Sequence, residues 1–214
     1  MKNTILLLCC LASFLELNAA TFYVTTNADD GPGSLRQGIA DANANPGPDL
    51  IMFSHVSGTI SLTSALPTVS DSLAIQGPGA DLLTVSGNGL VRVFELLSGT
   101  TNTISALTIA DGLAPLNANG GGICNSGTLF IASCKIVNNR TYGGFGGGIY
   151  SAGNLGINYS TIWSNHGSRA GRIRRFRTER RRRRRGRIWR RAVHSSGHRR
   201  CHKLRVQPKC SSGW

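Results

Sequence analysis

Basic residues are scarce over most of the chain and crowded at its end. Of the 24 Lys and Arg residues, only five lie in residues 1–168, together with nine of the ten Asp and Glu residues. The last 46 residues hold the other nineteen basic residues and a single acid. The formal net charge of +14 therefore comes from residues 169–214, and any nucleic-acid-binding function must depend on that segment alone.

Several patterns that would indicate a function class are missing as well. Beyond residue 20, no apolar stretch approaches the about 20 residues that a membrane-spanning helix needs. His55 and His166 have no Cys or second His at zinc-ligand spacing. The Gly-rich segment 143–148 is not followed by Lys-Ser or Lys-Thr, which excludes a phosphate loop. An apolar content of 40% without a Gly-X-Y period excludes a collagen-like or fully disordered chain.

Residues 1–20 have the pattern of an export signal. Lys2 supplies the positive start, residues 5–15 form an apolar run, and Ala19 and Ala20 offer small residues for cleavage. The pattern predicts an exported protein, either secreted or held at the outer membrane or cell surface. A buried N-terminal strand is one alternative. The adjacent Cys9 and Cys10 leave a lipoprotein signal as another.

Residues 21–48 are predicted to form an N-terminal cap, which consists of a strand and a short helix. Thr21–Thr25 is rich in β-branched and aromatic residues, as in a strand. Ser34 and Gln37 have the spacing of a capping box, which marks a helix start. The helix should end at Asn45, before Pro46, and should cover the first coil of the domain. Its apolar stripe consists of Leu35, Ile39 and Ala42.

Residues 49–166 carry short strands and an internal repeat. Gly120-Gly121-Gly122-Ile123 recurs 26 residues later as Gly146-Gly147-Gly148-Ile149. Ile104, Ile131 and Ile157 follow one another at 27 and 26 residues, and Ile109, Ile136 and Ile162 keep the same offsets. Units of this length without helical spacing predict an all-β solenoid in which parallel strands of successive coils pair. The expected strands are Asp49–Phe53, Gly58–Leu62, Ser72–Ile75, Leu82–Val85, Val91–Leu96 and Thr103–Ile109.

Single residues within the coils have structural interpretations. Cys134 is expected to be a small buried hydrophobe. Asn138 and Asn165 lie at the ends of predicted strands, where asparagine tolerates a left-handed backbone, so a turn role is preferred over ligand binding. Asp29 and Asp30 are weak candidates for calcium, and a solvated turn is the preferred interpretation.

Carboxylates are few after the cap, which limits the case for catalysis. A carbohydrate-active enzyme of this shape needs clustered carboxylates, or carboxylates beside a basic residue and a cation. Asp81 and Asp111 have the sequence context of turn residues instead. No catalytic, cofactor-binding or metal-binding residue is assigned, and no cofactor is expected. The acids after the cap are Asp49, Asp71, Asp81, Glu95 and Asp111.

Two stretches carry a resemblance to a known family. Residues 24–37 (VTTNADDGPGSLRQ) with 41–47 (DANANPG) resemble the N-terminal capping segment of exported bacterial right-handed parallel β-helix proteins. Residues 73–86 and the two Gly-Gly-Gly-Ile repeats are similar to their coils. The nearest family is the pectin-lyase-like, polymorphic outer-membrane-protein-type repeat family. The resemblance implies a right-handed parallel β-helix and an exported role. Membrane attachment would need a C-terminal anchor, which the sequence does not show.

The resemblance favours a structural or adhesive protein without enzymatic activity, whose partner is an unidentified surface ligand or polysaccharide. A polysaccharide lyase or hydrolase fragment is the alternative. Nucleic-acid binding through the Arg-rich tail is a second alternative, although specific recognition of nucleic acid is not expected of an exported chain. Fold alone does not choose among these functions.

Residues 167–214 are expected to be a disordered basic tail, and six consecutive arginines occupy residues 180–185. Runs of CGG codons encode arginine in one frame and glycine in another, so a shifted Gly-rich repeat would give such a run. The 26-residue period also places the next Gly triplet at Arg172. A frameshift product is therefore the preferred hypothesis. A solvated arm and a phosphate-binding arm, with Phe176 and Trp189 stacking on bases, are the alternatives.

Overall fold

A computed structural model describes residues 19–168, which form one α-helix and sixteen β-strands. Every strand pairing in this range is parallel, which confirms the predicted all-β parallel β-helix. The elements are β1 (Thr21–Val24), α1 (Leu35–Ala44), β2 (Asp49–Phe53), β3 (Gly58–Ser61), β4 (Leu73–Gln76), β5 (Leu83–Ser86), β6 (Phe94–Leu96), β7 (Thr101–Ser105), β8 (Thr108–Ala110), β9 (Ile123–Asn125), β10 (Thr128–Ala132), β11 (Lys135–Val137), β12 (Arg140–Tyr142), β13 (Ile149–Ser151), β14 (Asn154–Asn158), β15 (Thr161–Trp163) and β16 (His166–Ser168).

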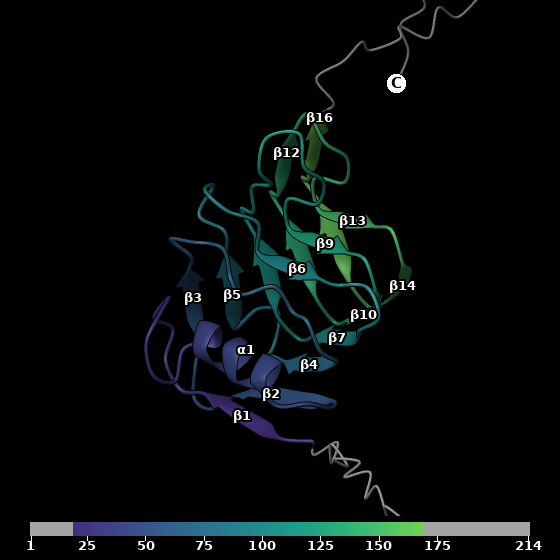
Figure 1. Cartoon of the computed structure of the whole chain (residues 1–214). Helices are drawn as coiled ribbons and strands as arrows, with labels where there is room; N and C mark the ends of the chain where they lie inside the picture. The colour runs from purple at the N-terminus through teal and green to yellow at the C-terminus, as the bar shows by residue number, and fades with distance from the viewer. Residues whose placement is uncertain (1–18, 169–214) are drawn as a thin grey trace, which may run out of the picture. The chain divides into compact units, whose positions relative to one another are not determined.

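The strands stack into four parallel sheets along the coil (Figure 1). Sheet A takes one strand from each of six coils, in the order β1-β2-β4-β7-β10-β14. Sheet B has the order β3-β5-β8-β11-β15, sheet C the order β6-β9-β13, and sheet D pairs β12 with β16. From β10 to β14 the chain therefore passes once through sheets A, B, D and C before it returns to sheet A.

Two rows of aliphatic side chains follow the coils and build the core. The predicted stacking of Ile104, Ile131 and Ile157 is confirmed by the register of sheet A. Partners in this row are 24, 29, 27 and 26 residues apart, so the 26–27-residue period holds only in the later coils. Burying each such side chain contributes roughly 1.5–3 kcal/mol. The sheet A row is Ile51, Ile75, Ile104, Ile131 and Ile157, and the sheet B row is Ile60, Val85, Ile109, Ile136 and Ile162.

The expectation of one strand over Thr103–Ile109 is wrong. Ala106 has a left-handed backbone with φ of 53°, and it turns the chain from β7 in sheet A to β8 in sheet B. Ser133 and Tyr159 occupy the same corner in the next two coils, with φ of 53° and 49°. Cys134 follows this corner and is buried, as the sequence predicts. The expected strand Val91–Leu96 is likewise shorter, because only its last three residues form β6.

The helix α1 lies against β1 and β2 at the N-terminal end of the coils (Figure 1). The Ser34 hydroxyl accepts a hydrogen bond from the Gln37 backbone N at 3.2 Å, as expected of an N-cap. The Gln37 side chain does not complete the capping box, since its Nε2 donates to Asp41 Oδ1 at 2.6 Å. Leu35 and Ile39 are fully buried in the main hydrophobic cluster, so the helix covers the first coil.

Two predictions fall outside the described residues. The apolar part of the export signal precedes residue 19, and all but the first two residues of the expected basic tail, 167–214, follow residue 168. The signal and the frameshift hypothesis therefore stay predictions. Within residues 19–168, no helix has the length and apolar character needed to cross a bilayer.

Candidate functional site

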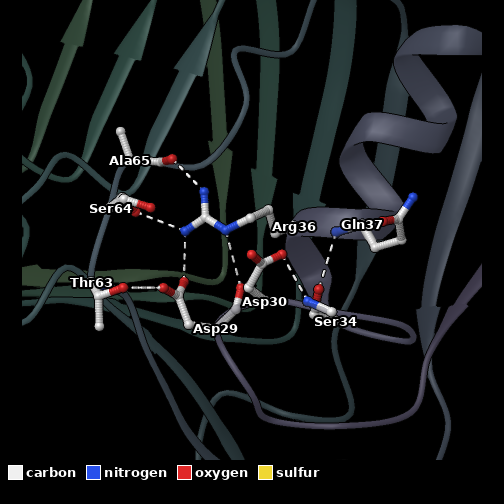
Figure 2. A network of polar contacts seen from close by, with 9 residues as sticks. Asp29, Asp30, Ser34, Arg36, Gln37, Thr63, Ser64 and Ala65 are labelled. Atoms are coloured by element: carbon white, nitrogen blue, oxygen red, sulfur yellow. Dashed lines mark hydrogen bonds and ion pairs between the residues drawn. The ribbon is translucent and has the colours of Figure 1, made fainter.

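A polar network ties the segment before α1 to the second coil (Figure 2). Arg36 Nη2 donates to Asp29 Oδ1 at 2.6 Å, and the Thr63 backbone N and hydroxyl donate to Asp29 Oδ2 at 3.1 and 2.5 Å. Arg36 also donates to the carbonyl oxygens of Ser64 and Ala65, at 2.9 and 2.5 Å. Asp29 therefore departs from the expected solvated turn, whereas the exposed Asp30 keeps a turn role by accepting from Gly31 N.

The environment of Asp29 favours its charged form. Partial burial acts to raise the pKa of Asp29, but the hydrogen bonds from Thr63 and Arg36 and the positive charge of Arg36 outweigh it. The pKa therefore lies below its ordinary value. Both carboxylate oxygens are occupied by protein donors, so this acid connects the cap to the coils and is not available for a ligand.

An asparagine ladder runs inside the coils just after sheet B. Oδ1 of the fully buried Asn139 accepts from Gly112 N at 2.7 Å, and the backbone N of Asn139 donates to Asn165 Oδ1 at 2.9 Å. The Nδ2 groups of Asn139 and Asn165 donate to Ile109 O and Ile136 O, at 3.1 and 2.8 Å. Each asparagine thus satisfies buried backbone groups of the preceding coil.

The structure confirms the expected left-handed turn for Asn138 but not for Asn165. Asn138 has the expected left-handed turn, with φ of 58°, and its counterparts in neighbouring coils are Asp111 and Ser164, with φ of 50° and 55°. Asn165 corresponds instead to Asn139. Two adjacent asparagines in Asn138-Asn139 conceal which of them repeats. Asn139 and Asn165 are 26 residues apart, which is the period of the repeat. This spacing is the signal that would have found the ladder.

The Gly-rich repeats bring neighbouring coils into close contact. A Cβ atom at Gly144 would lie 1.8 Å from Ala118 O, and one at Gly121 would lie 2.3 Å from Arg140 O. Such distances to backbone atoms leave no space for a side chain. The Gly-rich repeats therefore allow neighbouring coils to pack closely.

The acids after the cap have partners within the protein. Asp49 is buried at the start of β2, Asp71 accepts from Gly47 N and Ser72 N, Asp81 pairs with Lys135, and Glu95 pairs with Arg92. Residues 19–168 hold no group of three or more His, Cys, Asp or Glu side chains that could bind a metal ion.

Asp111 lines a polar hollow of about 310 Å³ at the end of sheet B. The Ser86 hydroxyl donates to Asp111 Oδ2 at 3.3 Å. Arg140 lies in the same hollow without an ion pair to any acid of residues 19–168. A carboxylate and a guanidinium therefore face one small hollow, with amide groups beside them. The complete lining is Asn88, Gly89, Asp111, Asn138 and Arg140.

Arg92 is a buried cation that the sequence analysis did not single out. Its Nε and Nη2 donate to the carbonyl oxygens of Gly120 and Asn119, at 3.0 and 2.9 Å, and Nη1 pairs with Glu95 at 2.8 Å. It thereby fixes the loop before β9. Beside it lies an apolar cleft of about 290 Å³, whose walls include Leu66, Leu90, Val93 and Leu113.

The outward positions of sheet A form an uncharged surface across all six strands. Side chains alternate along each strand, and the positions opposite to the buried rows face outward. Tyr23 and Phe130 are the large aromatic residues among them, with 60% and 49% exposure. The other outward residues are Thr21, Leu50, Met52, Ala74, Gln76, Thr101, Thr103, Ser105, Thr128, Ala132, Asn154, Gly156 and Asn158.

The two described cysteines are free thiols whose surroundings raise their pKa. Burial raises the pKa of the Cys134 thiol, despite hydrogen bonding to backbone groups. Burial also raises the pKa of the Cys124 thiol, although the charge of Arg92 acts in the opposite direction. Thiols that stay protonated are poor nucleophiles.

No family model matches the chain, and no curated protein matches its sequence. The described residues therefore establish a parallel β-helix, while the likeness to the pectin-lyase-like family stays a resemblance of motifs.

Proposed function

We propose that this chain is an exported β-helix repeat protein of the secreted or cell-surface kind, with a structural or adhesive role. In this proposal its partner is an uncharged surface polysaccharide, which lies along the outward face of sheet A. The proposal includes membership of the pectin-lyase-like, polymorphic outer-membrane-protein-type family, which rests on the cap and repeat motifs.

The observation that carries this proposal is the chemistry of the sheet A face. Its outward side chains are hydroxyls, amides, aliphatic groups and two exposed aromatic rings, without a charge among them. Hydroxyl and amide groups can both donate and accept hydrogen bonds, as sugar hydroxyls do. Aromatic rings offer a flat apolar surface against which a sugar ring can lie. Parallel strands at regular spacing would present these groups repeatedly to a repeating polymer.

Co-sedimentation with insoluble polysaccharides tests the proposed binding. The probes are cellulose, chitin and peptidoglycan suspensions, each incubated with the purified chain. Replacing both Tyr23 and Phe130 by Ala should weaken binding to the retained polymer at least roughly tenfold, because hot-spot aromatics each contribute more than about 1 kcal/mol and tenfold corresponds to about 1.4 kcal/mol. Tyr142→Ala, an equally exposed aromatic change on β12 of sheet D, is the matched control and should bind normally. If the chain binds none of the three polymers, the proposal is contradicted.

A carbohydrate-active enzyme is the second candidate, and the hollow between Asp111 and Arg140 favours it. A carboxylate can act as a general base beside a cation that binds an acidic sugar. Incubation with acidic and neutral polysaccharides, followed by assay of new reducing or unsaturated ends, tests this candidate. The enzyme candidate would be established over the adhesive role if the Asp111→Asn variant lost the activity and the Asp81→Asn variant kept it.

A further inference from the structure

Asp49 is a buried acid with one carboxylate oxygen left without a partner. The residue is only 3% exposed, at the start of β2. Its Oδ1 accepts from the backbone N of Ala20 and from Asn45 Nδ2, both at 2.8 Å. Within residues 19–168, Oδ2 has no hydrogen-bond partner. A buried ionised carboxylate is costly unless donors or a positive charge surround it, so Asp49 lacks a partner that its position requires.

The sequence predicts cleavage near Ala19 or Ala20. In the structure, cleavage after Ala19 and cleavage after Ala20 differ in the hydrogen bonds that they would keep. The backbone O of Ala20 accepts from Leu50 N at 2.9 Å, while its N donates to Asp49. Cleavage after Ala20 would remove both hydrogen bonds and leave Asp49 with Asn45 alone. Cleavage after Ala19 would keep both.

We propose that a signal peptidase cuts between Ala19 and Ala20, and that the new α-ammonium group of Ala20 forms a buried ion pair with Asp49. Water adds across the Ala19–Ala20 peptide bond, which leaves a carboxylate on Ala19 and a protonated amine on Ala20. One amide N–H is thereby replaced by three N–H donors and a positive charge. The ammonium can donate to both oxygens of Asp49, so Oδ2 gains its partner.

The ion pair links export to stability. In the uncut chain, Asp49 is a buried carboxyl group with donors on one oxygen only. In the cut chain, Ala20, the residue before β1, is held to β2 by an ion pair and by the Leu50 hydrogen bond. This inference rests on the proposed export of the chain.

Expression of the full chain in a secreting bacterium tests the cleavage site. After cell fractionation, N-terminal sequencing of the exported product should give Ala20-Thr21-Phe22. An exported product that begins at another residue overturns the inference while export stands. A chain retained uncut in the cytoplasm overturns the proposed export and the cleavage together.

The ion pair is tested separately, on residues 20–214 prepared with a free or an acetylated N-terminus. The free amine should raise Tm by about 5 °C over the acetylated chain, because the buried carboxylate gains a charged donor. The Asp49→Asn variant should show no such difference, whereas Asp30→Asn, a change at an exposed acid, should keep it. Equal Tm values for the free and acetylated wild-type chains would overturn the ion pair, even if Asp49→Asn does not fold.

Discussion

The two ends of the coil stack differ in how completely they cover the apolar core. At the N-terminal end, α1 places Leu35 and Ile39 over the first coils, and Ile51 in the second coil is fully buried. At the C-terminal end of the described coils, Ile157 is 40% and Ile162 is 46% exposed, although both lie in the inward rows. The helix therefore closes one end, and no described element closes the other.

The difference shows that register alone does not bury a side chain. Ile131 and Ile136 stand one coil before Ile157 and Ile162, in the same rows, and at most 1% of either is exposed. What separates them is the presence of a following coil. An aliphatic residue stabilises the fold in proportion to the area that its neighbours remove from water. Terminal repeats of a solenoid accordingly need a cap.

The largest expected contrast between the ends comes from placing a charge in each. Leu35→Asp should lower the free energy of unfolding by roughly 4 kcal/mol or more, because it buries an unpaired carboxylate under the helix. Ile157→Asp should cost only about 1 kcal/mol, since water reaches that position. Urea denaturation of both variants measures the difference, and equal losses would contradict a closed and an open end.

The asparagine ladder sharpens the comparison with a smaller effect. Asn139→Ala should cost about 2–3 kcal/mol, because it leaves Gly112 N and Ile109 O buried without their partner. Asn165→Ala removes the same bonds one coil later, where water can replace them, and should cost about half as much. Thermal unfolding of the two variants is the measurement. A larger loss for Asn165 would show that the last described coil is covered.

The smallest expected effect concerns the acid that fastens the closed end. Asp29→Asn should cost about 1–2 kcal/mol at pH 7, through the lost charge-assisted bonds to Arg36 and Thr63. Because folding lowers the pKa of Asp29, its contribution is complete above the unfolded value of about 4 and disappears as pH falls through the folded value. Unfolding measured from pH 7 to pH 2 should show the variant converging with the wild type. Asp30→Asn is the control, and a pH-independent gap would contradict the network.

Much of the fold follows from the sequence because it depends on spacing along the chain. The repeat at 26–27 residues gives the stacked isoleucines, and the Ser34 cap with its apolar stripe gives the helix. Cys134 is buried because it occupies a position between inward residues. These features need only the alternation of strands and the period of a helix, which short stretches of sequence contain.

The tertiary structure alone decided which groups meet across coils. The pairing of Asp29 with Thr63, the hollow that Asp111 shares with Arg140, and the donation from Ala20 to Asp49 each join residues about 30 apart. Loops of unequal length separate them, as the spacings of 24 and 29 residues in the early coils show, so no fixed period locates these partners. The exposure of Ile157 could not be predicted from the sequence either, because its sequence context matches that of the buried Ile131. Local spacing determines which way a side chain points, whereas burial and pairing depend on what the rest of the chain places beside it.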